Sequence, residues 1–255
     1  MQWNDTAIVL SARKYGENSA VVRIFSRQQG VYGGVVRAAY SKSNRGIIQP
    51  GNIVSATWSA RLEEQLGSLK MEMLEPCAAL LMADPGRLAA LTALCALIES
   101  ALPERHPYVK LYHAFCLYIR RLKTDDKWQA SYVQMELELL AEAGFGLDLR
   151  NCAATGVTQD LIYVSPKSGR AVCRSAGAPY HEKMLPLPAF LIAADKKNLA
   201  KSAEILDGMR LAGYFLEHWL LVPHHRKLPA ARTRLIQIMK ATHQIRTGNA
   251  AKTDS

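Results

Sequence analysis

Two cysteines in the sequence each begin a short segment, here called a frame, that is typical of half of a zinc knuckle. Cys152 is followed by "AATG" and Cys173 by "RSAG", which puts Thr155 and Ala176 where a second cysteine would stand. A structural zinc site takes four thiolate or imidazole ligands. We therefore expect two knuckle turns without metal or other cofactor. One alternative stays open, with Cys152, Cys173 and His181 around a metal-bound water. The glycine that ends each frame suits a turn with positive φ.

Other residue types that could do chemistry form no familiar catalytic pattern. The chain contains no G-x-x-x-x-G-K-[ST], G-x-G-x-x-G, G-x-S-x-G or H-E-x-x-H motif. His224 and His225 are expected on a solvated loop, and Glu136, Glu138 and Glu142 on a solvated helical face. We therefore expect a protein that is not an enzyme.

The overall composition favours a polyanionic partner. The chain has 255 residues, a net charge of +10 and a pI near 9.4, with 49% hydrophobic residues. Its longest apolar runs are shorter than the roughly 20 residues that cross a bilayer, and no signal peptide is apparent. The five cysteines, odd in number, imply no disulfide framework. We expect a cytoplasmic protein with no membrane partner.

The charge is concentrated near the two ends of the chain. Residues 13–61 carry eight basic side chains and one acidic side chain, and residues 223–252 carry seven basic side chains and no acidic one. Residues 81–150, between them, carry eight basic and nine acidic side chains. A surface of one sign suits contact with a nucleic-acid backbone, with aromatic rings under the bases. The candidate nucleic-acid contacts are Arg13, Lys14, Arg23, Arg27, Arg37, Tyr40, Lys42, Arg45, Arg61, Arg226, Lys227, Arg232 and Arg234.

The first basic region coincides with a predicted β-barrel. Runs of β character cover residues 6–15, 20–28, 31–40, 52–60 and 67–74, separated by glycines. Five short strands at this spacing predict an OB-fold, with an SH3-like barrel as the rival. Tyr32 and Trp58 fall among alternating apolar residues and are expected in the barrel core, whereas "YSKSNRG" is expected in a mobile loop.

The rest of the chain has mainly helical patterning, so the fold class is α+β. Asp84 with Pro85 predicts a helix start, Gly144 a helix end, and Asn198 a cap for a later helix that Pro223 stops. A β-hairpin is expected around residues 166–169. The predicted divisions are a barrel at 1–78, a first helical part at 79–148, a metal-free zinc-ribbon-like hairpin at 149–185, a second helical part at 186–248 and a frayed tail at 249–255.

This order of parts resembles the RecO family of bacterial DNA repair proteins, in particular its alphaproteobacterial branch. The likeness covers almost the whole chain, and its most telling segments are "RIFSRQQGVYGGVVRAAYSKSNRGIIQPG" and "CAATGVTQDLIYVSPKSGRAV". Some members of the family bind zinc through two C-x-x-C pairs, a pattern from which this sequence departs at both second positions.

The resemblance implies a recombination mediator without catalytic turnover. Such a protein binds single- and double-stranded DNA, anneals complementary strands and joins RecR. It also contacts the acidic C-terminal tail of the single-stranded DNA-binding protein (SSB) and helps to load RecA onto SSB-coated DNA, in association with the nucleoid. The candidates for the SSB-tail contact are Arg120, Arg121, Lys123 and Arg210.

Two other functions are compatible with the charge. A general RNA-binding barrel protein would use the same cations, and an adaptor would bind acidic proteins through them. Strand annealing in the presence of SSB separates the mediator from both alternatives.

Overall fold

The computed structural model describes residues 1–62, 64–192 and 202–253 and divides into two compact units. The first unit comprises residues 1–124 with 229–232, and the second comprises residues 125–228 with the chain from Thr233 onward. The helices between the barrel and Thr124 therefore cluster with it, whereas residues 79–148 were predicted to belong to one helical part.

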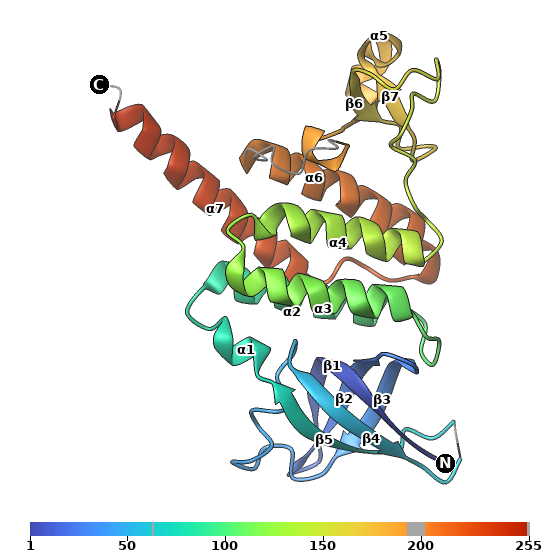
Figure 1. Ribbon diagram of the computed structural model, residues 1–255, viewed down its shortest axis with the longest axis vertical. Coiled ribbons are helices and arrows are strands. Elements are labelled where there is room, and N and C mark those ends of the chain that lie inside the picture. Colours follow the sequence, from blue (N-terminus) through green and yellow to red (C-terminus); the bar gives the residue numbers. More distant parts are fainter. Residues whose placement is uncertain (63, 193–201, 254–255) are drawn as a thin grey trace. The chain divides into compact units, whose positions relative to one another are not determined.

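The first unit contains a closed five-stranded barrel (Figure 1). Its strand order is β1-β2-β3-β5-β4, and every pair is antiparallel except β3 with β5. This arrangement confirms the predicted OB-fold. The strands are β1 (Gln2–Tyr15), β2 (Ser19–Ser26), β3 (Gly30–Val36), β4 (Ile53–Ser59) and β5 (Ser68–Glu75).

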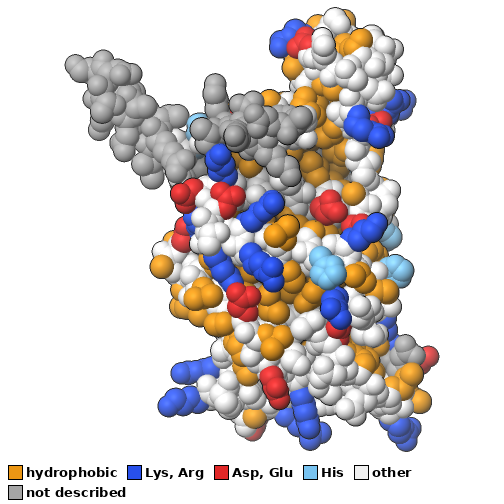
Figure 2. Space-filling model, in the orientation of Figure 1, with side chains coloured by type: hydrophobic (Ala, Val, Ile, Leu, Met, Phe, Trp, Pro, Cys, Tyr) orange, Lys and Arg blue, Asp and Glu red, His pale blue; other side chains and the backbone are white. Residues whose placement is uncertain are grey.

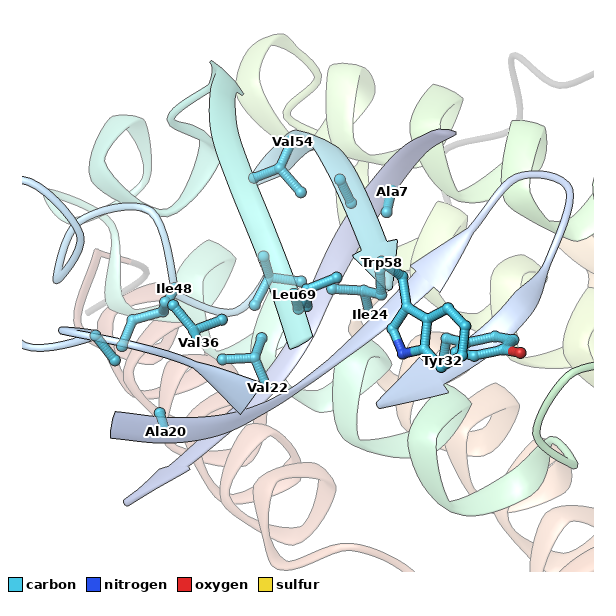
Figure 3. Close-up of a cluster of buried hydrophobic side chains, with 13 residues drawn as sticks. Ala7, Ala20, Val22, Ile24, Tyr32, Val36, Ile48, Val54, Trp58 and Leu69 are labelled. Carbon is cyan, nitrogen blue, oxygen red and sulfur yellow. The ribbon is translucent and has the colours of Figure 1, made fainter. Parts of the chain in front are cut away.

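The burial of the barrel core follows the alternation of inward and outward residues in β4. Trp58 and Tyr32 are 1% and 4% exposed, and their rings meet edge to face with centroids 5.1 Å apart. The indole nitrogen of Trp58 donates to the carbonyl oxygens of Gly33 and Leu66, at 3.2 and 3.0 Å. Figure 3 shows these two rings at one end of the cluster, with Val36 at the other. The prediction that both aromatics are core residues is confirmed.

The connection from β3 to β4, residues 37–52, is here named the basic loop. It is a succession of turns held by side-chain amides. The amide nitrogen of Asn44 donates to the carbonyl oxygen of Ala38 at 3.1 Å, and that of Asn52 donates to Gly46 at 2.7 Å. The loop expected to be mobile is therefore tied down by hydrogen bonds.

Three helices complete the first unit: α1 (Cys77–Leu80), α2 (Pro85–Ala101) and α3 (Val109–Thr124). Asp84 caps α2 as predicted, because its side chain accepts from the backbone N–H of Arg87 at 3.0 Å. Helix α2 packs on β1, where the thiol of Cys95 lies 3.6 Å from the carbonyl oxygen of Val9.

The second unit combines helices with a small sheet. Helix α4 packs against α6, and Gly144, with φ of 91°, follows the end of α4 as predicted. The predicted hairpin is present, with β6 between β7 and β8 in the sheet. The elements of the second unit include α4 (Trp128–Glu142), β6 (Leu161–Val164), β7 (Ala171–Cys173), α5 (Arg174–Gly177), β8 (Leu185–Pro186) and α6 (Ser202–Phe215).

The chain after α6 differs from the single helix expected there. A π-helical segment, η3 (Leu216–Leu221), and a 3₁₀ turn, η4 (Val222–His224), precede α7 (Ala230–Thr253). The final helix thus continues into the tail that was expected to fray. Asn198, the predicted cap, lies outside the described residues.

The expectation for the three glutamates of α4 is wrong at one position. Glu136 is fully buried, whereas Glu138 is exposed and Glu142 is intermediate. A charged residue in a helical pattern is normally assigned to the solvent face, so its burial had no signal in the sequence.

Candidate nucleic-acid interface

The predicted basic contacts on the barrel divide according to whether they have an acidic partner. Arg13 and Arg23 lie 3.3 and 3.5 Å from Glu99 of α2, and Arg23 also lies 2.6 Å from Glu104. Arg27 is 3.9 Å from Asp5 at the β2–β3 turn. Arg13 and Arg23 thus connect the barrel to α2 and the segment after it, whereas Arg27 pairs with strand β1 of the barrel itself. Part of the charge of these arginines is therefore balanced within the first unit.

The other predicted cations of the barrel have no ion pair with any described residue. All are exposed, and in Figure 2 blue side chains project around the barrel in the lower part of the view, with some acidic ones among them. They present positive charge that the protein itself does not neutralise, as contact with a phosphate backbone requires. These residues are Lys14, Arg37, Lys42, Arg45 and Arg61.

Strand register brings two of these cations to the same end of the barrel. Lys14 pairs with Ala20 on β2, and Ala20 pairs with Val36, which precedes Arg37. The backbone N–H of Ala39 donates to the carbonyl oxygen of Asn18 at 2.9 Å, which joins the β1–β2 turn to the basic loop. Residues that lie more than twenty positions apart in the sequence therefore form one surface.

Two exposed rings accompany this surface. Tyr40, which was predicted, is 45% exposed, and Tyr15, which was not, is 57% exposed beside Lys14. Bases stack on such rings regardless of sequence. Lys70 was also missed; its exposed position on β5 alternates with buried Leu69, a pattern that could have identified it.

The C-terminal candidates differ in exposure. Arg226, Lys227 and Arg234 are exposed, but Arg232 is only 3% exposed. Arg232 is therefore not available to a phosphate in this structure, and the other three keep that role as a prediction.

The candidates for an SSB-tail contact lie in different units. Arg120 and Arg121 are exposed on α3, one turn after Leu117, which is itself 50% exposed. Lys123 forms an ion pair with Glu75, and Arg210 is exposed on α6 in the second unit. Among these candidates, only Arg120 and Arg121 combine a nearby exposed apolar side chain with the absence of an ion pair to any described residue.

The two knuckle frames meet around their cysteines. Cys152 and Cys173 are 1% and 3% exposed, and the backbone N–H of Cys173 donates to the sulfur of Cys152 at 3.3 Å. The hydroxyls of Thr155 and Ser175 lie 3.6 and 3.4 Å from the sulfur of Cys173. Two cysteine sulfurs and two hydroxyls fall short of the four thiolate or imidazole ligands that a structural zinc site takes, so this donor set does not fit the metal.

Elsewhere, too, the described residues include no group of three or more His, Cys, Asp or Glu side chains that could hold a metal ion. The imidazole of His181 lies 3.3 Å from the carbonyl oxygen of Ala178, and the residue is exposed.

The knuckle glycines serve different purposes. Gly156 has φ of 76°, as predicted, but Gly177 has φ of −88°, so the expectation of positive φ is wrong there. A Cβ atom on Gly177 would lie 2.4 Å from the ring of Tyr163. Close packing against the hairpin, rather than turn geometry, accounts for this glycine.

The thiol of Cys152 has an unusual acidity. Burial raises its pKa, but hydrogen bonds from the Thr155 hydroxyl and from backbone N–H groups, that of Cys173 among them, outweigh burial and lower the pKa to about 6. The knuckle thus stabilises a thiolate through hydrogen bonds.

None of the helices in the described part of the chain is long and apolar enough to cross a bilayer.

Comparisons with known proteins cover nearly the whole chain. The family model "Recombination protein O N terminal" matches residues 1–77, and "Recombination protein O C terminal" matches residues 82–229. The chain is 45% identical over 245 residues to the DNA repair protein RecO of Rhodospirillum centenum, covering 95% of this chain and 96% of the relative.

Two further relatives give the same result. The RecO of Rhodospirillum rubrum is 45% identical over 245 residues, covering 94% and 97% of the two chains. That of Ruegeria sp. is 42% identical over 240 residues, covering 94% and 98%. The chain therefore belongs to the RecO family of DNA repair proteins, as its barrel and helical parts led us to expect.

Proposed function

We propose that this RecO-family protein binds single- and double-stranded DNA through the basic surface of its barrel. Membership of the family gives the coarse role, that of a recombination mediator in DNA repair. The observation that carries the DNA contact is that five predicted cations of the barrel are exposed and form no ion pair with any described residue: Lys14, Arg37, Lys42, Arg45 and Arg61.

The mode of binding follows from the chemistry of this surface. Arginine and lysine contacts to phosphates confer affinity and salt dependence but read no sequence. Tyr15 and Tyr40 add sequence-tolerant stacking. A surface of this kind suits strand annealing, because complementary strands of any sequence must be held close while their repulsion is neutralised.

The remaining steps concern partners. We propose that the protein acts without catalytic turnover, joins RecR and helps to load RecA onto SSB-coated DNA near the nucleoid in the cytoplasm. The SSB tail would bind beside Leu117, with Arg120 and Arg121 supplying the positive charge for its acidic residues. The candidate Arg210 offers an alternative contact on α6.

The experiment compares labelled DNA and RNA oligonucleotides of equal length, followed by annealing of complementary DNA strands coated with SSB. We expect salt-dependent DNA binding and annealing of the coated strands. Failure to bind DNA at low salt would refute the proposal. Binding to both nucleic acids without annealing would favour the RNA-binding alternative, and binding only to acidic proteins would favour an adaptor.

A further inference from the structure

A pocket of about 340 Å³ lies on the barrel next to the point where β3 and β5 stop pairing. The parallel pairing of these strands is recorded at Val35 with Ser68, where the backbone N–H of Val35 donates to the carbonyl oxygen of Gly67 at 2.9 Å. Later residues of both strands line the pocket together with the basic loop. Its lining is Val36, Arg37, Asn44, Ile47, Ile48, Ser68, Leu69, Lys70 and Met71.

The pocket has an apolar floor and a cationic rim. Val36, Ile48 and Leu69 belong to the buried barrel core, and Figure 3 shows Val36 and Ile48 side by side, away from the aromatic end. Arg37 and Lys70 are exposed and form no ion pair with any described residue. They occupy equivalent positions, each two residues after its member of the Val35–Ser68 pair.

Polar groups in the pocket can form hydrogen bonds with the edge of a planar ligand. The amide nitrogen of Asn44 is held by Ala38, which leaves its carbonyl oxygen to accept a hydrogen bond. The hydroxyl of Ser68 can donate or accept. No described residue that lines the pocket is acidic or aromatic.

We propose that this pocket holds one unstacked base of a DNA strand, with the adjoining phosphates on Arg37 and Lys70. The inference rests on the proposed DNA binding and assigns it a specific site for single strands. A strand carries a phosphate on both sides of each base, which matches an apolar pocket between two cations. Ligand pockets start at about 300 Å³, so the volume of this pocket is near the lower end of the range. It suits one nucleotide unit better than a peptide of several residues.

The basic loop connects this pocket to the surface already described. Arg37 belongs to both, and Tyr40, Lys42 and Arg45 follow it along the chain. A duplex keeps its bases paired and stacked, so only a single strand can fill the pocket. The site would therefore make the barrel prefer single strands to duplexes.

The test measures the affinity for an oligothymidine and for an abasic strand of the same length and charge. Met71→Trp fills the pocket, and Ile47→Phe does so from the loop in case the first variant folds poorly. Leu74→Trp is the matched control, because Leu74 is 54% exposed on the same strand and does not line the pocket. Circular dichroism verifies that each variant is folded.

We expect the unmodified protein to bind the oligothymidine about fivefold or more tighter than the abasic strand, because the pocket buries the apolar face of a base. Either filled variant should lose most of that difference and keep its affinity for the abasic strand, whereas Leu74→Trp should behave like the unmodified protein. A preference that is undiminished in both filled variants would assign the bases to the exposed tyrosines and overturn the pocket. The pocket would also be reassigned if an acidic peptide with an apolar end displaced the oligothymidine but not the abasic strand. That result would make the peptide, and not a base, the occupant of the pocket.

The two proposals fail in different ways. Equal affinity for the two strands would overturn the base pocket and leave DNA binding intact. Failure to bind either strand at low salt would overturn the proposed function itself.

Discussion

The side-chain amide of Asn44 donates a hydrogen bond of 3.1 Å to the carbonyl oxygen of Ala38 at the start of the basic loop. Ala38 has φ of 49°, in the left-handed region that alanine rarely adopts. The bond therefore stabilises an unfavourable backbone conformation between Arg37 and Tyr40. Through this contact the loop presents its cations from a defined position.

Replacement of Asn44 by alanine should lower the free energy of unfolding by about 1 kcal/mol, because the carbonyl oxygen of Ala38 loses this donor and keeps only the backbone N–H of Ser41. Urea denaturation measures the change. Ala38→Gly in the same background should recover part of it, since glycine adopts positive φ without steric cost. Equal unfolding midpoints for the unmodified protein and Asn44→Ala would show that the bond does not stabilise the loop.

Replacement of Trp58 by phenylalanine should destabilise the barrel and spare DNA binding. Phenylalanine has no indole N–H, so the carbonyl oxygens of Gly33 and Leu66 lose a buried donor at a cost of about 1–3 kcal/mol. Thermal unfolding measures stability, and oligonucleotide titration well below the melting temperature measures affinity. A loss of affinity at unchanged stability would place Trp58 in the binding surface instead.

The Cys152 thiolate should be present at neutral pH. Its pKa of about 6 lies below the ordinary 9.0, so the ionised form stabilises the folded state. This contribution is full above about pH 9 and is lost as the pH falls through about 6. Thiolate absorbance should titrate near pH 6 and vanish in Cys152→Ser, and Thr155→Val should move the midpoint upward. A midpoint above pH 8 in the unmodified protein would contradict the hydrogen-bonded thiolate.

Metal analysis of the purified protein should find well below one zinc per chain. Thr155 and Ala176 stand where a knuckle would have thiolates, so the donor set is incomplete. The double replacement Thr155→Cys with Ala176→Cys should supply four cysteines and raise the zinc content toward one. One zinc per chain in the unmodified protein would refute our interpretation of the two frames.

Much of the fold could be predicted because its signals are local. The alternation around Trp58, the Asp84–Pro85 start of α2 and the glycine after α4 each determine structure within a few residues. The hairpin turn at Gly169, with φ of 66°, is of the same kind. These elements follow from backbone preference and periodicity alone.

The candidate site was less predictable because its geometry depends on distant contacts. Glu99 lies 86 positions from Arg13 in the chain, so the partial neutralisation of that arginine had no local signal. The pocket depends on where β3 and β5 stop pairing, which no single segment specifies. The burial of Arg232 in a basic, helical stretch likewise contradicts the pattern of its neighbours.

The salt dependence of binding to a single-stranded oligonucleotide tests the central claim most directly. Lys42→Ala with Arg45→Ala removes two exposed cations of the basic loop, and Lys110→Ala with Lys127→Ala removes the same charge from exposed positions outside it. The loop variant should bind more weakly and lower the slope of log affinity against log salt by roughly 1.4, or 0.7 for each phosphate contact. The control pair should leave the slope unchanged. Equal affinity and slope for the loop variant and the unmodified protein would contradict the assignment of DNA binding to the basic loop of the barrel.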